Sequence, residues 1–537
     1  MYKRQQEHCL RCRILAVLIN ILTDAKKVML MNQRKLGVLL GYLNIGLNTV
    51  LGLAYVPIML HYIGKNEYGI YQLIGSLIAY FTVMDFGLTP AVVRFYTKYR
   101  LQQDELAMEN LLAVVLRMYT VIALLMAAGG CVVYYYMPRL FADTMTAAEV
   151  LLAQRLFILL LVNIIASIST MCFRAVIEAN QKFVVIKGLE TLQFLLQPLL
   201  VIGLLRVWPS SMTMALVMTS LNVFLICIRI YYCFAKLKVR IRYHYFDRVL
   251  FIEFKRLALS VFVVSLIDQV FYKTNQFILG VVSGTEAVAV YAIAAMIYYN
   301  YMSLSTAISG VFFPHVVELI SKNSPVQVLS DLFIKVGRLQ FFVLALVTSG
   351  FIVFGREFIN LWAGASFADA YVIVLLVVFP MSFDLVQNLG LSIMMAKNKY
   401  DFRAKLYFVM GIVNLVLSYY LAQRYGGIGC AFAMGLVLTI GNGLVINCYH
   451  KIVNKLDIGR FWRELARCAL PVIILTACAV WVDALLAGGG GLLFLLKLFV
   501  YTLLYMLAVY KFAFNDYERG LVHNAAGRLK SLACRRS

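Results

Sequence analysis

The sequence predicts an all-α membrane protein with about fourteen transmembrane helices, arranged as two six-helix lobes followed by two further helices. Two observations lead to this fold class. Fourteen apolar stretches between residues 37 and 514 are each about long enough to cross a bilayer. The composition agrees, because 62% of the 537 residues are hydrophobic and only 14% are charged, which is far from the average of soluble domains.

The positive charges support this count and give the orientation. If the N-terminus is cytoplasmic, 39 of the 49 Lys and Arg residues lie in or beside the two tails and the even-numbered loops, and five lie in the odd-numbered loops. Basic residues resist translocation, so both termini are expected in the cytoplasm. The net charge of +23 is spread over all the cytoplasmic loops. It therefore indicates contact with membrane lipid headgroups and no nucleic-acid partner.

The expected spans follow one another with short connections. They are residues 37–60, 70–92, 111–135, 156–175, 183–205, 212–234, 257–281, 288–312, 339–359, 371–394, 406–422, 428–448, 468–486 and 492–514. The connection between the sixth and seventh spans contains the basic, aromatic stretch KLKVRIRYHYFDR, which is expected to lie along the headgroups. It lies near the middle of the chain, where two halves would join.

This order of spans divides the chain into six expected parts. They are a cytoplasmic tail at 1–35, an N-terminal lobe at 36–235, a basic linker at 236–256, a C-terminal lobe at 257–448, two additional helices at 449–514 and a basic tail at 515–537. The first thirty residues differ from the rest, and Met29 or Met31 is a more natural start. Cys9 and Cys12 form a CxxC pair without a second pair, so no metal site is expected.

A weak internal repeat relates the two expected lobes. Gly64 and Tyr71 follow the first span, and Gly284 and Tyr291 follow the seventh at the same spacing. Because both pairs lead into a long span of the same direction, the repeats are expected to be parallel, about an axis along the membrane normal. A Gly and a Tyr match often by chance, so this pattern alone decides little.

Several motifs support the repeat by resemblance. In order along the chain they are Asp85–Tyr96 (DFGLTPAVVRFY), Glu178–Phe183 (EANQKF), Asn275–Gly280 (NQFILG), Glu286–Tyr291 (EAVAVY), Ala396–Lys399 (AKNK) and Tyr425–Ala431 (YGGIGCA). As a set they resemble the polysaccharide transporter branch of the multidrug/oligosaccharidyl-lipid/polysaccharide exporter superfamily. Asn275 departs from that family, which often has an acidic residue at this position of the seventh span.

The resemblance implies a function and a location. It implies a flippase of a lipid-linked oligosaccharide in the bacterial cytoplasmic membrane, with a central cavity between two six-helix lobes. It also implies a polysaccharide polymerase and glycosyltransferases as partners, and no cofactor. On this reading the chain transports its substrate and is not an enzyme.

Ionisable side chains inside the expected spans are the candidates for function. Asp268 and Asp384 lie so far from the ends of their spans that a short carboxylate cannot reach water, so each must face protein or a hydrated cavity. Arg117, Lys273 and Lys497 lie nearer the ends and can alternatively extend to the headgroups. Polar amides in the same spans can either line a cavity or hold helices together.

The chemistry of a lipid-linked oligosaccharide selects among these residues. Its diphosphate requires cations, and its sugars require amides, hydroxyls and flat rings. The candidate substrate-binding residues are Asn44, Arg94, Arg117, Gln269, Tyr272, Lys273 and Asn300. Asp268 and Asp384 are the candidate ion-coupling residues, because alternating access needs a group whose protonation or ion occupancy differs between two states.

Two alternatives stay open. An ion-coupled drug or small-molecule efflux transporter of the same fold would use acidic residues and an apolar pocket, and Asp268 and Asp384 are compatible with it. A membrane enzyme would need clustered His or carboxylate residues near an interface. The six His residues are scattered along the chain and the outer loops are short, so this second alternative is disfavoured.

Overall fold

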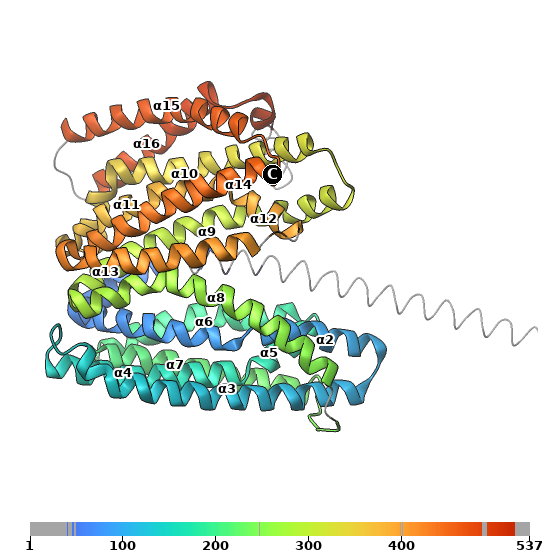
Figure 1. Ribbon diagram of the computed structural model, residues 1–537. Helices are drawn as coiled ribbons and strands as arrows, with labels where there is room; N and C mark the ends of the chain where they lie inside the picture. Colours follow the sequence, from blue (N-terminus) through green and yellow to red (C-terminus); the bar gives the residue numbers. More distant parts are fainter. Residues whose placement is uncertain are drawn as a thin grey trace, which may run out of the picture. The chain divides into compact units, whose positions relative to one another are not determined.

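The structure is a computed structural model, and it describes residues 40, 44, 46–47, 50–245, 248–397, 399, 401–485, 491–520 and 523. These residues are almost entirely helical, with no β-strand among them (Figure 1). Eleven described helices are long and apolar enough to cross a membrane. The expected all-α membrane fold class is therefore confirmed, while the exact number of spans and the side of each terminus stay predictions. The expected N-terminal tail and most of the C-terminal tail lie outside the described residues.

The described chain divides into two compact units, and the boundary between them along the chain falls within helix α8. The first contains the described residues up to Ala142 together with Thr146–Leu266, and the second contains Asp143–Met145 and the described residues from Ile267 onward. The lobe boundaries expected at residues 235 and 257 stay a prediction. Each unit is described separately below.

The first unit consists of long helices that pack side by side. Residues 50–82 are helical and lead into the 3₁₀ turn η1. The further elements are η1 (Val83–Asp85), α2 (Leu88–Gln102), α3 (Glu105–Leu140), α4 (Ala147–Ser169), α5 (Met171–Ala179), α6 (Phe183–Leu205), α7 (Ser211–Ala235) and the first part of α8 (Arg248–Val282). Helix α4 packs against both α3 and α7 (Figure 1).

The second unit holds the rest of α8 and the remaining helices. They are α9 (Thr285–Ser321), α10 (Val326–Trp362), η2 (Ala365–Phe367), α11 (Asp369–Leu385), α12 (Asn388–Ala396), α13 (Asp401–Leu438), the π-helical segment η3 (Thr439–Val445), α14 (Ile446–Ile452), α15 (Ile458–Leu485) and α16 (Gly491–Phe512). Helix α11 packs against both α9 and α13, so it lies at the centre of this unit.

In two places a single helical run continues from one expected span into the next, and a glycine with an unusual backbone conformation lies at each junction. Gly64 has a φ of 75° within the helical run 50–82, and Gly426 has a φ of 53° and a ψ of −132° within α13. Residues with a Cβ rarely adopt these angles, so glycine allows the chain to change direction without leaving the helical hydrogen-bond pattern for long. The first and second expected spans, and the eleventh and twelfth, are joined in this way.

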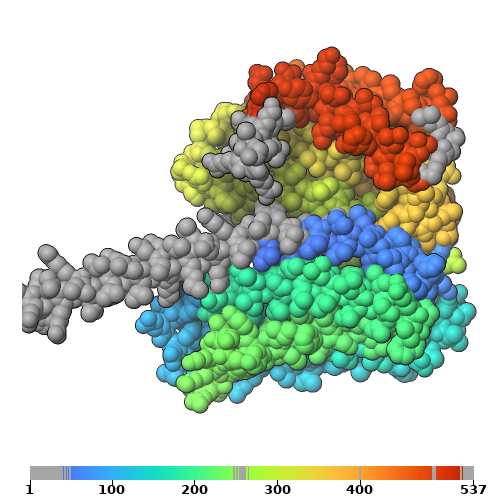
Figure 2. Space-filling model, turned by 180° about the vertical axis from the view of Figure 1, so that it is seen from behind, coloured from blue at the N-terminus to red at the C-terminus, as the bar shows by residue number. Residues whose placement is uncertain are grey.

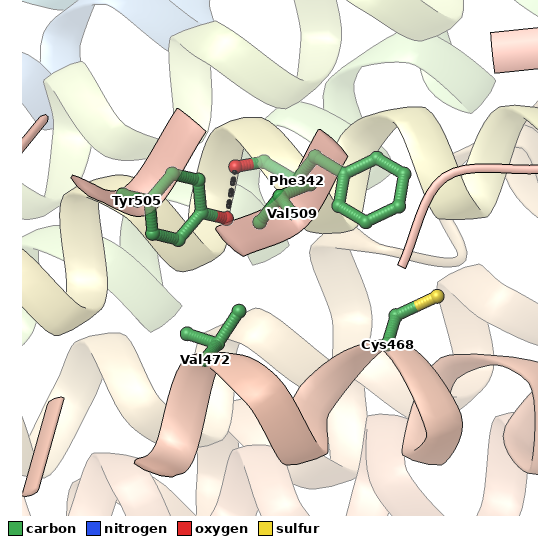
Figure 3. Packing of buried hydrophobic residues seen from close by; sticks show 5 residues of the cluster. All are labelled: Phe342, Cys468, Val472, Tyr505 and Val509. Atoms are coloured by element: carbon green, nitrogen blue, oxygen red, sulfur yellow. Dashed lines mark hydrogen bonds between the residues drawn. The ribbon is translucent and has the colours of Figure 1, made fainter. Parts of the chain in front are cut away.

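The C-terminal helices α15 and α16 are attached to α10 by a small apolar core. Its buried side chains are Phe342, Cys468, Val472, Tyr505 and Val509 (Figure 3). The hydroxyl of Tyr505 donates a hydrogen bond to the carbonyl oxygen of Phe342 at 2.8 Å. In Figure 2 these helices, in red, form an outer face of the second unit. Large apolar side chains such as Leu495 and Phe499 are exposed there, as expected of a surface that faces lipid.

A buried ion pair fastens the chain after α16 to α10. The guanidinium of Arg338 donates from Nε and Nη2 to the two carboxylate oxygens of Glu518 at 2.7 and 2.8 Å, and from Nη1 to Glu464 at 3.0 Å. The side chains of Arg338 and Glu518 are 6% and 2% exposed. Because a buried charge needs a partner, this bidentate pair fixes the position of residue 518 beside α10.

Part of the basic stretch after α7 folds back onto α3. The side-chain oxygen of Asn110 accepts hydrogen bonds from the backbone N–H groups of His244 and Tyr245 at 3.0 and 3.2 Å. The imidazole of His244 lies 3.0 Å from the carboxylate of Glu109. The stretch that was expected to lie along the headgroups is therefore also tied to the first unit by side chains of α3.

Candidate functional site

The candidate site of the second unit is organised around the hydroxyl of Tyr407 on α13. This oxygen accepts hydrogen bonds from Nη2 of Arg403 at 3.0 Å and from Nδ2 of Asn442 in η3 at 2.9 Å. It donates to the carboxylate of Asp384 on α11 at 3.4 Å. Tyr407 is 4% exposed and Asn442 is fully buried. We call Asp384, Arg403, Tyr407 and Asn442 the Tyr407 cluster; it connects three elements through one oxygen atom.

Arg403 supplies the positive charge of this cluster. Its guanidinium carbon lies 4.8 Å from the centroid of the Tyr407 ring, within the range of a cation–π contact. It also interacts electrostatically with the carboxylates of both Asp268 on α8 and Asp384. Asp268 is exposed and Asp384 is half-buried. Asp268 and Asp384, the two acidic candidates from the sequence, thus share Arg403 as their cation. Arg403 itself was expected in the connection before the eleventh span, which was expected to begin at residue 406.

Aromatic rings continue from the Tyr407 cluster along α8 to α9. The ring of Tyr407 lies 5.8 Å from that of Phe271, which lies 5.0 Å from that of Tyr272, which in turn lies 6.1 Å from that of Tyr299. The hydroxyl of Tyr299 donates to the carbonyl oxygen of Tyr272 at 3.2 Å. These four rings are called the aromatic row. Tyr272 and Tyr299 are half-buried.

A cation lies at each end of the aromatic row. Arg403 stacks on Tyr407 at one end, and Nζ of Lys273 lies 4.7 Å from the ring centroid of Tyr299 at the other. Gln269 is half-buried on α8, three residues before Tyr272 and therefore on nearly the same side of the helix. Asn300 donates to the carbonyl oxygen of Met296 within its own helix at 2.9 Å. Among the four predicted substrate residues of this unit, Tyr272 thus belongs to the row and Lys273 contacts it.

Asn275 belongs to a packed amide network and not to a charged site. Its Nδ2 donates to the hydroxyl of Tyr291 at 2.8 Å, and its Oδ1 accepts from Nδ2 of Asn414 at 3.3 Å. Ser418 donates to the Oδ1 of Asn414 at 3.2 Å. All four side chains are fully buried. A carboxylate at position 275 would place a charge in this neutral layer, so the departure from the family pattern is accommodated by hydrogen bonds between α8, α9 and α13.

The predicted substrate residues of the first unit lie on different elements. Asn44 is 5% exposed and binds α6, donating to the carbonyl oxygen of Lys187 at 3.2 Å and accepting from the hydroxyl of Thr191 at 2.6 Å. This is the arrangement expected of a side chain that holds two helices together. Arg94 on α2 is exposed, and Arg117 on α3 lies 4.0 Å over the ring of Tyr243. Their roles in substrate binding stay predictions.

A second group of charges joins α5, α6 and α7 in the first unit. Arg174 contacts Glu178 at 3.3 Å and Glu190 at 2.9 Å, and Nζ of Lys187 contacts the other oxygen of Glu190 at 2.8 Å. Arg229 interacts electrostatically with Arg174 and Glu190. We call these five residues the Glu190 cluster. None of these five residues was among the candidates from the sequence, although the i, i+3 spacing of Lys187 and Glu190 and the i, i+4 spacing of Arg174 and Glu178 are visible in it.

Lys497, which could have extended to the headgroups, is paired inside the second unit. Its Nζ lies 2.8 Å from Asp483 on α15 and 3.5 Å from Glu357 on α10. Its side chain is 11% exposed. Two carboxylates on neighbouring helices neutralise the ammonium, so the residue joins α16 to the rest of the unit.

The second unit also contains an apolar cavity of about 780 Å³. It is bordered by residues of α9, α10, α11 and α15. Polar atoms at its wall are already engaged: the hydroxyl of Tyr301 lies 2.8 Å from that of Thr348 and 2.7 Å from that of Ser382. A cavity of this chemistry can accept hydrocarbon more readily than sugar or phosphate.

Comparisons with known proteins agree with this architecture. Residues 37–320 match the family described as polysaccharide biosynthesis protein. Among solved structures, a lipid II flippase in an inward closed conformation is similar with a TM-score of 0.70 at 16% identity, covering 91% of this chain and 99% of that one. A multidrug resistance transporter of the multidrug and toxin extrusion (MATE) family, inward-facing and of the same exporter superfamily, has a TM-score of 0.59 at 14% identity, covering 76% of this chain and 96% of that one. Curated proteins gave no match.

Proposed function

The chain belongs to the polysaccharide biosynthesis protein family of this exporter superfamily, and from this premise we propose that it moves a polyprenyl-diphosphate-linked oligosaccharide across the bacterial cytoplasmic membrane. Such a step supplies repeat units for a surface polysaccharide. The similarity of the fold to a lipid II flippase is consistent with cargo of this kind. Eleven helices that could cross a membrane are consistent with a protein that moves such a lipid between the two leaflets.

The observation that carries this proposal is the aromatic row with a cation at each end. Sugars bind by stacking on flat rings and by hydrogen bonds to amides and hydroxyls, and a diphosphate binds cations by charge-assisted hydrogen bonds. Tyr272 and Tyr299 offer half-buried aromatic side chains, and Arg403 and Lys273 offer the cations. Gln269 adds an amide beside the row. One unit thereby presents both kinds of chemistry that the two polar parts of the substrate require.

Substrate movement requires a change of state, and Asp268 and Asp384 are the residues that we assign to it. Both interact with Arg403, so protonation or ion binding at either carboxylate would weaken the hold on that cation. Arg403 would then be available to the diphosphate in one state and retained by the carboxylates in the other. Only such a difference in affinity between two states can drive alternating access.

Ion-coupled efflux of a drug or another small molecule is the second candidate function. The two carboxylates near Arg403 favour it, and so does the similarity to the multidrug resistance transporter. A cationic drug would need the carboxylates free, whereas Arg403 stands beside both of them. The two candidates therefore make opposite demands on this arginine.

A transport assay in vesicles separates the two functions. The purified protein is reconstituted with a polyprenyl-diphosphate-linked oligosaccharide, and arrival of the sugar in the other leaflet is measured by cleavage with an added glycosidase. We expect transport by the wild type, and a loss of at least about tenfold in Arg403→Gln and in Lys273→Gln. Arg356, an exposed residue of α10 outside the Tyr407 cluster and the aromatic row, gives the control Arg356→Gln, which should leave transport unchanged.

The same vesicles are then loaded with a fluorescent cationic dye. Dye transport that survives or rises in Arg403→Gln, together with no movement of the glycolipid by the wild type, would establish the efflux function and exclude the flippase. Glycolipid transport without dye transport would exclude efflux.

A further inference from the structure

The Glu190 cluster holds more positive than negative charge in a half-buried place. Three cations, Arg174, Lys187 and Arg229, lie with two carboxylates, Glu178 and Glu190. The side chains of the four ion-paired residues are between 18% and 35% exposed, so the cluster is sheltered but open to small polar groups. Sheltered cations attract anions more strongly than fully solvated ones, because less water screens the charge.

Arg229 is the residue whose hydrogen bonding is incomplete. It comes from α7, and its Nε is buried without any hydrogen-bond partner. Its charge is repelled by Arg174 and attracted by Glu190, which Arg174 and Lys187 already share. A buried N–H group normally has an acceptor, and the described side chains provide none for this nitrogen. An anion bound here would give Arg229 that acceptor and would relieve the repulsion between the two arginines.

The position of the cluster suggests where such an anion comes from. In the expected topology the turn between α5 and α6 lies on the cytoplasmic side, and Arg174, Lys187 and Glu190 lie within about three turns of that turn. Asn44 and Thr191 fix this part of α6 through the carbonyl oxygen of Lys187. The cations thus lie near the depth at which the phosphates of a lipid in the inner leaflet are found.

From these observations we propose that the Glu190 cluster is a first anion site, separate from the aromatic row, that takes the diphosphate of the polyprenyl-linked substrate on the cytoplasmic side before Arg403 and Lys273 do. This inference rests on the proposed function for the identity of the lipid. Arg229 donates to a phosphate oxygen, and Arg174 and Lys187 exchange their contacts with Glu190 for contacts with the diphosphate. Glu190 therefore competes with the ligand for Arg174 and Lys187, and a dianionic group displaces it from them.

Competition predicts effects of opposite sign for two variants. Arg229→Gln removes the unpaired cation and should weaken diphosphate binding by about tenfold. Glu190→Gln frees Arg174 and Lys187 and should tighten it. A cluster that only holds α5, α6 and α7 together would show weaker or unchanged binding in both variants. Arg206→Gln, at the other end of α6 and exposed, is the matched control and should bind like the wild type.

Binding is measured with the full chain in nanodiscs of phosphatidylcholine by native mass spectrometry. The probes are polyprenyl diphosphate, phosphatidylglycerol and inorganic diphosphate. Polyprenyl diphosphate should bind more tightly than phosphatidylglycerol and depend on Arg229. Equal binding of phosphatidylglycerol would assign the site to ordinary membrane lipid and overturn the proposal, as would binding that is unchanged in Arg229→Gln.

Two further measurements keep the test decisive. If Arg229→Gln does not insert or fold, Arg229→Lys preserves the charge without the planar donor group and should show an intermediate affinity. The vesicle assay is run in parallel. If the wild type transports the glycolipid but binding does not depend on Arg229, only this inference is refuted. If binding depends on Arg229 but the wild type does not transport the glycolipid, the proposed function is refuted and the anion site remains.

Discussion

Replacing Tyr407 by phenylalanine tests whether the Tyr407 cluster organises the second unit. The change keeps the ring, its cation–π contact with Arg403 and its contact with Phe271, and it removes only the hydroxyl. The hydroxyl makes a charge-assisted hydrogen bond with Arg403 at 3.0 Å, a neutral one with Asn442 at 2.9 Å and a long one with Asp384 at 3.4 Å. The variant therefore isolates the hydrogen bonds of this one oxygen atom.

The expected loss of stability follows from those distances. A hydrogen bond to a charged group contributes about 1.5–3 kcal/mol, and a neutral one between membrane helices about 0.6 kcal/mol. The long contact with Asp384 adds little. The free energy of unfolding should therefore fall by about 2–4 kcal/mol. Tyr505→Phe is the matched control, because Tyr505 is a buried tyrosine of the same unit with one neutral partner at 2.8 Å, and it should lose only about 0.6 kcal/mol.

Equilibrium unfolding in detergent micelles, followed by tryptophan fluorescence, measures both variants. The vesicle assay measures their transport, which should fall by roughly tenfold in Tyr407→Phe, because Arg403 loses the group that orients it. Transport in Tyr505→Phe should stay near the wild-type rate. If Tyr407→Phe is as stable as Tyr505→Phe and transports normally, the hydroxyl of Tyr407 does not organise the site.

Three other predictions address separate parts of the chain. Glu518→Gln leaves Arg338 buried with less negative charge beside it and should lower the free energy of unfolding by about 3–5 kcal/mol, measured by the same micelle assay; a change below 1 kcal/mol would contradict the burial argument. Asp268→Asn keeps the shape of the side chain but cannot titrate, so a proton gradient should no longer accelerate transport, and unaltered acceleration would remove Asp268 from the coupling role. Reporter fusions after Ser283 and after Lys322 should report opposite sides of the membrane, and a common side would refute the expected spans around α9.

The sequence alone determined the class of the protein. Each span must be apolar along its own length because no water is available in the bilayer core, and each loop carries its own charge bias. These are local properties of the sequence, so the fold class and the family could be predicted from it without knowing which helices pack against one another. The breaks at Gly64 and Gly426 were also local in origin, since both glycines lie in the expected connections between spans.

Tertiary structure decided how the polar residues are combined. Tyr407 receives Asn442 from 35 residues away, and Arg338 reaches Glu518 across 180 residues. Helical periodicity specifies only neighbours within about two turns, so it could group Asp268 with Tyr272 but could not bring Arg403 to them. Arg403 itself looked like one more cytoplasmic charge. Its contacts with Tyr407 are visible only in the folded chain, because the helices that surround a side chain set its electrostatic environment.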